Sequence, residues 1–503
     1  LRQFKTLDAM MRALTSTPVL SKLAMITKEL PDKIKRRLIL DCLQSGINSK
    51  TLQQERILLP MITDIVGDTL DLMATMTEQE LIEYFVLDFT DAFFKLPLNV
   101  AEWPFFAARY KDTWMHWTRV AQGSRNGPQL FGRLSAFVGR VTQGALDPNR
   151  ARLHIFTDDP IAILKGTRAE IDRTMSIMIM LWRTLGFDLA FAKGQSGPSV
   201  VWIGHLVTVS ADKVEVQIKP EFLQGLYDDT VKLLRRNTIT YKALRAYAGR
   251  TSHAANLMWA WRPFMDSLWA AIHTEGDTMA RRRSKAPSGQ VWTHQVRSSL
   301  QWIRGFLVAS GNKVIRTWPL AAFLSTAADI ILAFDASPWG LGGVAYIRGV
   351  PRFYICEPLG ELDYMRFGKR PTDKDNGQQV WECLAALVVL KVWRHIWCNG
   401  RFTLGMRGDN VTALTMTMKF KASSPEVRTI AREVAHLMTS APYMPTIFEH
   451  VLGIVNQVAD ALSRRYDPSR AEGWTLPSSL ASATLSSCPP RDKDFYVMDA
   501  TSA

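Results

Sequence analysis

The stretch LHIFTDDPIAILKG, residues 153–166, decides how the first half of the chain is interpreted. Two adjacent acids, Asp158 and Asp159, stand between two short apolar runs, and Pro160 follows them. Asp and Pro are common turn residues, and apolar runs on either side of a turn are typical of a β-hairpin. A plain hairpin turn is therefore the simplest interpretation, and a metal site requires partner carboxylates elsewhere in the chain.

The composition describes a globular chain with an excess of positive charge. Of its 503 residues 47% are hydrophobic, and 61 Lys and Arg against 47 Asp and Glu give a formal net charge of +14. At about 150 residues per domain, this length predicts roughly three domains. The basic excess favours an acidic partner, most commonly nucleic acid, and a merely soluble surface is the plainer alternative.

The five cysteines include no CxxC pair, which argues against a disulfide framework and a zinc site. A reducing, intracellular setting fits, without a choice between cytoplasm and nucleus. No apolar run approaches the roughly 18 residues of a membrane-spanning helix, so no membrane partner is expected. The chain opens on no secretory signal and begins at Leu1 rather than Met, which favours a piece of something longer, such as a processed polyprotein.

The pattern of apolar runs and breaks predicts four regions. Residues 1–220 interleave strands and helices, an α+β or α/β arrangement, and residues 325–470 return to the same pattern. Residues 221–324 look helical and basic, with eleven Lys and Arg between Val231 and Lys285 and with interleaved tyrosines and tryptophans. Such residues suit phosphates and bases, although an ordinary solvated face with core aromatics explains them too. The Ser- and Pro-rich residues 471–503 predict a flexible tail.

A partner for the Asp158 turn stands upstream, in FVLDFTDAFFKLPL, residues 85–98. Asp88 ends an apolar strand-like run, where an unpaired buried charge would be costly. Asp88 and Asp158 on adjacent strands could share two divalent ions that clamp the attacking and leaving oxygens of a phosphoryl transfer. Oxygen ligands suit Mg²⁺, which takes one or two carboxylates plus substrate phosphates. For Asp88 alone, a helix N-cap or a turn acid is the simpler alternative.

Six segments of this region resemble the motifs of reverse transcriptases and follow the same order. FVLDFTDAFFKLPL resembles the first palm motif, LDLKDAFFxIPL, and FTDD resembles the YxDD box. The other matches are KRRLILD (35–41), SGIN (45–48) and ERILLP (55–60) to the fingers, AQGSRNGPQLF (121–131) to QG-x-x-x-x-P-x-x-F, LGFDLAFAKGQ (185–195) to the lysine motif, and VVWIGHLV (200–207) to the primer grip. The resemblance implies a right-hand polymerase, with fingers and palm in residues 1–220 and a thumb or connection in 221–324.

The resemblance also implies roles for the matching residues. Asp88 and Asp158 would hold two Mg²⁺ ions, with Mn²⁺ as an alternative, and Asp159 would stand beside them. The residues implied to act on the incoming nucleotide are Phe93 as the gate against a ribose 2′-hydroxyl, Gln122 and Gly123 behind the pocket, Arg37 on the triphosphate and Lys193 as the proton donor to pyrophosphate. A core position for Phe93 and solvated surface positions for Arg37 and Lys193 are the alternatives.

Two departures from the motif surround the acid pair. Phe156 replaces the usual Tyr, which keeps the apolar bulk and loses a hydroxyl. Pro160 stands where the family usually has Ile, Leu or Val, and it removes an amide donor from the outgoing strand. We expect Pro160 at a tolerated edge or turn position, and a weakened or inactive polymerase is the alternative.

A second set of acids lies in the third region, beginning with Asp335 in FDASPWGLGGV (334–344). Glu382 opens the helix ECLAALVVLKVW, Asp409 follows the strand FTLGMRG, and Asp460 lies in HVLGIVNQVADALSRR (450–465). Four acids at element edges could bind two metal ions. Taken singly, Glu382 and Asp460 read as helix-face acids and Asp409 as a helix N-cap.

Together these acids resemble the ribonuclease H domain, in which Asp, Glu, Asp and Asp follow in this order and which ends on HxxGxxNxxAD-LSR. The resemblance implies that two metal ions bind at Asp335, Glu382, Asp409 and Asp460. It implies a catalytic role for His450, whose proton exchange near neutral pH suits the handling of product or water. Asn456 would be a substrate-side or a structural amide.

The two acid sets, in this order, resemble a retroelement Pol fragment of LTR-type or DIRS-like kind, over roughly residues 33–465. The resemblance implies an RNA-directed DNA polymerase with ribonuclease H activity, whose partners are an RNA template, a DNA primer, dNTPs and the RNA–DNA hybrid. One alternative is a decayed or domesticated copy that binds hybrid without catalysis, and a less favoured one is a DNA-templated polymerase with a proofreading nuclease. The sequence leaves the oligomeric state open.

Overall fold

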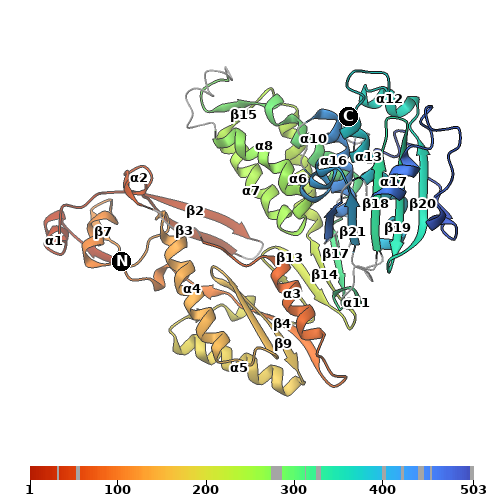
Figure 1. The fold of residues 1–503 in the computed structure, drawn as a ribbon. Helices are drawn as coiled ribbons and strands as arrows, with labels where there is room; N and C mark the ends of the chain where they lie inside the picture. Colours follow the sequence, from red (N-terminus) through yellow and green to blue (C-terminus); the bar gives the residue numbers. More distant parts are fainter. Residues whose placement is uncertain are drawn as a thin grey trace. The chain divides into compact units, whose positions relative to one another are not determined.

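The structure is a computed structural model of the whole chain, a mixed α/β protein (Figure 1). It describes residues 1–30, 33–52, 57–273, 286–311, 313–324, 330–398, 404–420, 424–439, 447–451, 453 and 456–498. The chain forms two compact units, Leu1–Ile203 and Gly204–Ala503. The predicted four-region division stays a prediction, and the basic residues predicted at 281–285 and part of the ERILLP segment lie outside the described residues.

The centre of the first unit is a four-stranded antiparallel sheet. Its order is β11 (Gln195–Gly197), β4 (Leu81–Val86), β9 (Asp159–Gly166) and β8 (Ala151–Phe156). Helices α3 (Ile62–Met73), α4 (Gly127–Gly144) and α5 (Arg168–Thr184) pack against it. The core includes Trp182 of α5, which stacks on Phe85 and meets Phe89 edge-on with ring centroids 5.3 Å apart. This packing fixes the β4 end from which Asp88 follows.

The rest of the first unit consists of short elements around this sheet. One small sheet has the order β1 (Arg2–Phe4), β7 (Thr113–His116) and β6 (Ala107–Tyr110), and β2 (Lys22–Leu30) pairs with β3 (Lys33–Asp41) as a two-stranded hairpin. A further pair joins β5 (Phe89–Thr90) to β10 (Asp188–Leu189). The remaining elements are α1 (Leu7–Met11), α2 (Ile47–Lys50), β12 (Ser199–Trp202) and the 3-10 turns η1 (Ala92–Lys95), η2 (Val100–Phe105) and η3 (Phe191–Lys193).

The second unit begins with a helical region joined to a small antiparallel sheet. The sheet holds β13 (His205–Val209), β14 (Lys213–Ile218) and β17 (Ile315–Pro319), and β15 (Thr238–Thr240) pairs with β16 (Gln290–Trp292). The helical elements are α6 (Pro220–Leu234), α7 (Tyr241–Leu257), η4 (Trp259–Trp261), α8 (Arg262–His273), α10 (Thr293–Ala309) and α11 (Leu320–Phe323).

The aromatic residues of this helical region are largely core residues, which favours the core alternative that the sequence left open beside a role in base stacking. Tyr241, Tyr247 and Trp261 are each 5% exposed or less, and Trp261 packs edge-on against Trp302. These three rings therefore offer no face on which a base could stack. The cationic part of the prediction differs, because Lys232, Arg235, Arg236, Lys242 and Arg245 are all exposed.

A six-stranded mixed sheet forms the rest of the second unit. Its order is β22 (Ile447–His450), β21 (Leu404–Gly408), β18 (Ile330–Ala336), β19 (Gly340–Ile347), β20 (Val350–Pro358) and β23 (Thr484–Leu485). Strands β18, β19 and β20 pair antiparallel, whereas β18, β21 and β22 run parallel. The associated helices are α12 (Glu361–Phe367), α13 (Gln378–Val392), α14 (Arg394–Trp397), α15 (Val411–Lys419), α16 (Pro425–Thr439) and α17 (Gln457–Ser463).

Two of these helices cover opposite faces of the six-stranded sheet. A side chain at Gly342 would meet Ala459 and Ser463 of α17, whereas one at the next residue, Gly343, would meet Val389 of α13. Because successive residues of a strand face opposite sides, α17 and α13 lie on different faces. Residues 380–390 of α13 are all buried, so this helix forms the centre of the unit's core.

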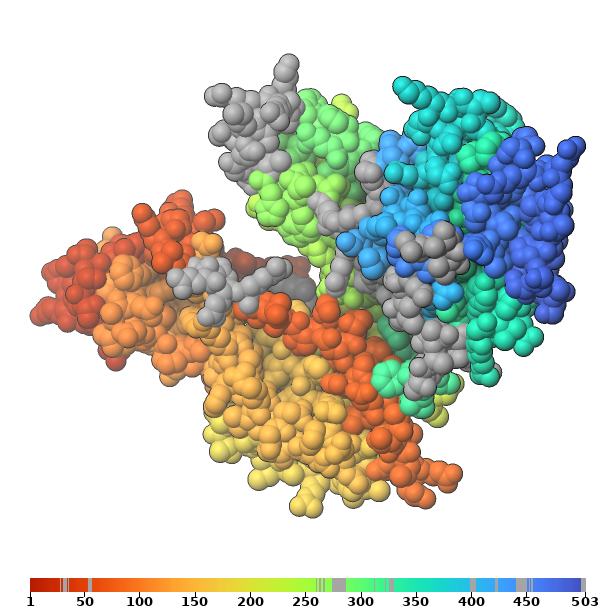
Figure 2. All heavy atoms as spheres, viewed as in Figure 1, coloured from red at the N-terminus to blue at the C-terminus, as the bar shows by residue number. Residues whose placement is uncertain are grey.

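The C-terminal residues differ from the predicted flexible tail over its described part, residues 471–498. A 3-10 turn, η6 (Ser478–Leu480), precedes β23, which pairs with β20, and Leu480, Tyr496 and Met498 are almost fully buried. Arg491 forms a buried ion pair with Asp363 of α12. Figure 2 shows this segment in dark blue, lying on the outside of the second unit. Among the described helices none is long and apolar enough to cross a bilayer.

Candidate active sites

The two acids at 158 and 159 lie in the tight turn that joins β8 to β9. Phe156 pairs with Asp159 across the hairpin, so Thr157 and Asp158 form a two-residue connection. Thr157 has a φ of 59°, a left-handed conformation that such turns require. The stretch is therefore a hairpin turn, as its turn residues predict, and the turn presents Asp158 at the end of the sheet.

Asp88 lies opposite this turn because the ladder between β4 and β9 continues past the end of β4. Leu87 N donates to Pro160 O at 3.4 Å, and Phe89 N donates to Asp158 O at 3.0 Å. Asp88 stands between these two bonds, and its own carbonyl accepts from Ala190 N at 2.9 Å. Backbone pairing thus places Asp88 and Asp158 on neighbouring segments, as predicted.

Pro160 is buried in a strand with partners on both sides, since β9 lies between β4 and β8. The expected edge position is therefore not what the structure shows, although the residue is only the second of β9. In an antiparallel ladder, the residue whose carbonyl accepts from Leu87 would also donate its N–H to the carbonyl of Leu87. Proline lacks that N–H, so one ladder bond beside Asp88 is absent.

A cavity of about 760 Å³ opens beside the two acids in the first unit. Its lining includes seven of the predicted residues: Arg37, Asp88, Phe93, Gln122, Gly123, Asp158 and Lys193. Arg36 adds another cationic side chain. Asp91 lines it too, and a pocket that combines three carboxylates with several cationic groups suits a polyphosphate ligand together with a divalent cation.

The residues predicted to form a nucleotide pocket are held by identifiable contacts. Phe93 packs against Phe131 of α4, with ring centroids 5.8 Å apart, so it is a packing residue that also faces the cavity. Gly123 has a φ of +111°, and a side chain there would collide with the carbonyl of Leu40 in β3. Leu40 N in turn donates to Gln122 O at 2.8 Å. The β2–β3 hairpin is thereby joined to the segment that contributes Gln122 and Gly123 to the cavity lining.

Asp88 and Asp158 each have a charged neighbour, which is Lys193 for Asp88 and Asp159 for Asp158. The ammonium group of Lys193 forms an ion pair with the carboxylate of Asp88. Asp159 does not line the cavity, and burial together with the charge of Asp158 raises its pKa to about 6. The Nε1 of Trp202 donates to the carbonyl oxygen of Asp159 at 2.9 Å and so holds the start of β9.

The second unit brings three of the four predicted acids together. Asp335 of β18, Glu382 of α13 and Asp409 after β21 offer carboxylate oxygens that all lie within 4.8 Å of one another. The parallel pairing of β18 with β21 and the contact of α13 with β18 produce this convergence. Asp335 and Glu382 are 3% and 4% exposed, so the cluster is largely removed from water.

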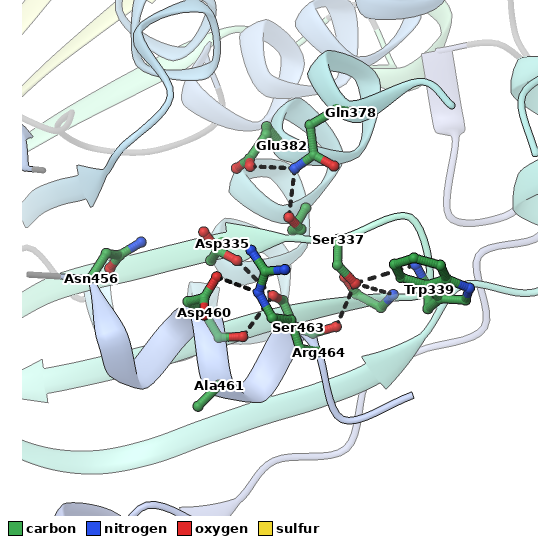
Figure 3. A network of polar contacts seen from close by, with 12 residues as sticks. Asp335, Ser337, Trp339, Gln378, Glu382, Asn456, Asp460, Ala461, Ser463 and Arg464 are labelled. Carbon is green, nitrogen blue, oxygen red and sulfur yellow. Dashed lines mark hydrogen bonds and ion pairs between the residues drawn. The ribbon is translucent and has the colours of Figure 1, made fainter. Parts of the chain in front are cut away.

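Burial and mutual repulsion make this cluster electrostatically unusual. Burial, and then the charges of Asp409 and Asp460, raise the pKa of Asp335 to about 7. The pKa of Glu382 lies well above its ordinary value, because of burial and then the charges of Asp335 and Asp409. Gln378 donates to Glu382 Oε1 at 2.8 Å, whereas Oε2 is buried with no hydrogen-bond partner among the described residues (Figure 3). A cation would relieve both the repulsion and the unpaired oxygen.

The remaining predicted residues of this site lie close by with different partners. Asp460 of α17 is outside the three-acid group and is paired with Arg464, whose Nε lies 2.6 Å from Asp460 Oδ1. His450 is exposed at the end of β22, with its Nε2 3.0 Å from the carbonyl oxygen of Asp409. Asn456 is buried and donates to Phe334 O at 3.0 Å, which favours its structural interpretation.

Four residues in direct contact with the acids were not predicted from the sequence. Gln378 stands one helical turn before Glu382, a spacing that places both on one face of α13. Ser463 and Arg464 follow Asp460 by three and four residues, a spacing that likewise places them on the same face of α17 as Asp460. Trp202 offers no such signal, because its contact with Asp159 joins residues that are 43 positions apart.

No protein-family model matches the chain, and no curated protein matches it in sequence. Solved structures of the foamy viral protease–reverse transcriptase are distantly similar. The one in complex with an RNA/DNA hybrid is 16% identical with a TM-score of 0.39, over 87% of this chain and 51% of that one. The one with double-stranded DNA is 14% identical with a TM-score of 0.40, over 87% of this chain and 79% of that one. The chain thus spans about half the length of the first.

Proposed function

We propose that the chain is an RNA-directed DNA polymerase with ribonuclease H activity, derived from a retrotransposon Pol. The observation that carries this proposal is the grouping of motif residues in two acid sites. Asp88 and Asp158 share a cavity with the residues implied to bind a dNTP, and Asp335, Glu382 and Asp409 converge in the second unit. Each set comes from distant parts of the sequence, which is unexpected for acids that act only as caps or surface charges.

Both sites fit divalent cations by the chemistry of their donors. Carboxylate oxygens are ligands that Mg²⁺ and Mn²⁺ accept, and Glu382 Oε2 is a buried acceptor with no hydrogen-bond partner among the described residues. We propose that Asp88 and Asp158 hold metal in the first site and that Asp335, Glu382, Asp409 and Asp460 hold it in the second. When bound, such ions stabilise the charge that develops on the oxygens of a phosphoryl transfer.

In the polymerase site, the chain's own residues would bind and orient the nucleotide. Arg37 and Arg36 face the cavity and would neutralise the triphosphate, while Gln122 and Gly123 support the base and sugar. Phe93, fixed against Phe131, would exclude a ribose 2′-hydroxyl. Lys193, which is ion-paired with Asp88 and lines the cavity, would donate a proton to the leaving pyrophosphate.

In the nuclease site, His450 is exposed and adjacent to Asp409, where it would accept or donate a proton as water attacks the RNA phosphate.

The partners that we propose are an RNA template, a DNA primer, dNTPs and the resulting hybrid. The exposed lysines and arginines of α6 and α7 would contact phosphates. All five cysteines are free thiols, which fits the reducing, intracellular setting that we propose.

Two variants test the proposal, and each serves as the control for the other. Wild type should extend a DNA primer on an RNA template with dNTPs and Mg²⁺, and it should cleave the RNA strand of a preformed hybrid. Asp158→Asn should lose extension by roughly 100-fold or more and keep cleavage, since it removes only the charge at the first site. Asp335→Asn should do the reverse.

The alternative is a domesticated copy that binds hybrid without catalysis, and the residue that favours it is Pro160. Tight hybrid binding by wild type, without extension or cleavage above that of the two variants, would establish this alternative. Extension that persists in Asp158→Asn would remove the polymerase assignment and leave the nuclease assignment standing.

A further inference from the structure

Two residues that follow Asp460, Ser463 and Arg464, each contact a different acid of the second site (Figure 3). Ser463 Oγ donates to Asp335 Oδ2 at 2.6 Å. Arg464 Nε donates to Asp460 Oδ1 at 2.6 Å. Neighbouring residues at the end of one helix therefore hold acids that come from two separate elements.

Ser463 reaches Asp335 because α17 lies unusually close to the sheet. Asp335 pairs with Gly342 across β18 and β19, so both residues face α17. A Cβ at Gly342 would collide with the carbonyl of Ala459 and would stand only 2.6 Å from Ser463 N. The backbone of Gly342 does not have a positive φ, so backbone conformation does not require a glycine there. The close approach of α17 does, because it leaves no space for a side chain.

The Ser463 contact fixes the position of Asp335. Ser463 is fully buried, and its hydroxyl also lies 2.9 Å from the carbonyl of Asp460. A hydroxyl has one proton to donate, and the shorter contact to the charged carboxylate is the stronger bond. The backbone carbonyl of Ser463 accepts a hydrogen bond from Ser337 Oγ at 2.7 Å. Asp335 therefore enters the three-acid cluster in one orientation.

Whereas Ser463 holds Asp335 within the three-acid group, Arg464 pairs with Asp460, which lies outside that group. The guanidinium group supplies the positive charge that Asp460 would otherwise seek from a metal ion, and Asp460 lies outside the three-acid group. The two side chains are 36% and 34% exposed, so solvent screens the pair and a stronger cation can replace it. A phosphate group nearby would also draw the guanidinium away from the carboxylate.

We propose that Ser463 and Arg464 are positioning residues that divide the four acids into two classes. Asp335, with Glu382 and Asp409, forms a preset site for a first cation, and Arg464 is the counter-ion that keeps Asp460 occupied until a second cation or a substrate phosphate displaces it. This inference rests on the proposed nuclease function. It predicts opposite effects from substitutions at two adjacent positions, which a general structural role would not produce.

Direct metal binding tests the division without reference to activity. The full chain carrying Asp88→Asn and Asp158→Asn, which removes the acids of the first site, is titrated with Mn²⁺ in the absence of nucleic acid, by calorimetry and by electron paramagnetic resonance. In this background Ser463→Ala should weaken the tighter site by roughly tenfold or more, because it removes a partner that orients a metal ligand. Arg464→Gln should strengthen the weaker site by about fivefold, because it removes a screened ion pair that competes with the metal.

Arg465→Gln is the matched control, since Arg465 lies over the Tyr466 and Trp474 rings and its substitution should change neither site. Thermal melting of the metal-free variants reports whether each remains folded, and Ser463→Cys replaces Ser463→Ala if the latter unfolds. Two Mn²⁺ sites that are the same in Ser463→Ala, Arg464→Gln and Arg465→Gln would overturn the inference and leave the nuclease proposal intact. Absence of saturable Mn²⁺ binding in the background protein would overturn both.

Discussion

The indole Nε1 of Trp202 donates a hydrogen bond to the backbone carbonyl of Asp159, 2.9 Å away. Trp202 is 1% exposed and also meets Phe156 edge-on. It therefore contacts both strands of the β8–β9 hairpin just beyond the turn that carries Asp158. The position of Asp158 therefore depends on a residue that lies far from it in sequence and does not line the cavity.

Trp202→Phe should reduce primer extension by roughly tenfold, because the hairpin loses a fixed contact and small displacements of reacting groups are costly. The lost hydrogen bond should lower the free energy of unfolding by about 1–2 kcal/mol. Urea unfolding and steady-state extension measure the two effects. Tyr84→Phe is the control, since it removes another buried hydrogen bond of this sheet, to Thr69 Oγ1 at 3.2 Å. Equal loss of extension in both variants would contradict a specific role for Trp202.

Pro160→Val should leave extension within about twofold of wild type. The bonds that place the Asp88 segment use the carbonyl oxygens of Asp158 and Pro160, and these are present with either residue. Valine would add the missing N–H donor to the Leu87 carbonyl, which is worth about 1 kcal/mol, and would lose a similar amount of proline's entropic advantage. Ile161→Val is the matched control. Extension that rises more than tenfold in Pro160→Val would show that the proline impairs the proposed polymerase activity.

The sequence predicted the grouping of Asp88 and Asp158 because one lies just after a strand and the other in a turn, where local patterns are informative. Asp88 after an apolar run and Asp158 between turn residues are of this kind, and the structure places both beside one cavity. The continuation of the ladder past β4 could not be predicted, since it depends on pairing between segments that are distant in the chain. For that reason an edge position was expected for Pro160.

Composition was misleading in two places where burial depends on a few anchoring residues. In α7, Tyr241, Leu244 and Ala248 are buried at helical spacing, a periodicity that the alternation of basic and aromatic residues conceals. The C-terminal segment is rich in small polar residues, yet Leu480 and Tyr496 are fully buried. A flexible tail was predicted from the average, whereas the packing follows these anchors and one long-range ion pair.

That ion pair joins Arg491 to Asp363, with Nε and Nη2 lying 2.9 and 2.8 Å from the two carboxylate oxygens. Arg491→Met should lower the free energy of unfolding by about 3 kcal/mol, because it leaves Asp363 buried without its partner. Combining it with Asp363→Asn should restore a large part of the loss. Urea unfolding measures both, and limited proteolysis should cut residues 471–498 faster only in the single variant. Wild-type stability and proteolysis in Arg491→Met would support a flexible tail after all.

His436 of α16 should make the second unit sensitive to acid. Burial, followed by the positive charges of Lys391 and Arg394, lowers its pKa from 6.5 to about 4. Its Nδ1 is buried without a hydrogen-bond partner in the described part of the chain, while Glu433 one turn earlier is engaged by Lys391 at 3.1 Å. The neutral ring is therefore the form that the folded protein accepts.

Because the folded pKa lies below the unfolded one, the unfolded chain takes up this proton first as the pH falls. The stabilising contribution of neutral His436 is complete above pH 6.5 and is lost as the pH falls towards 4, with a loss of about 2 kcal/mol by pH 5. His436→Gln and His436→Phe remove the titration with different packing, and both should flatten the decline in unfolding free energy between pH 7 and pH 5. Chemical denaturation at the two pH values measures it. A decline as steep as that of wild type in both variants would assign the acid sensitivity to other groups.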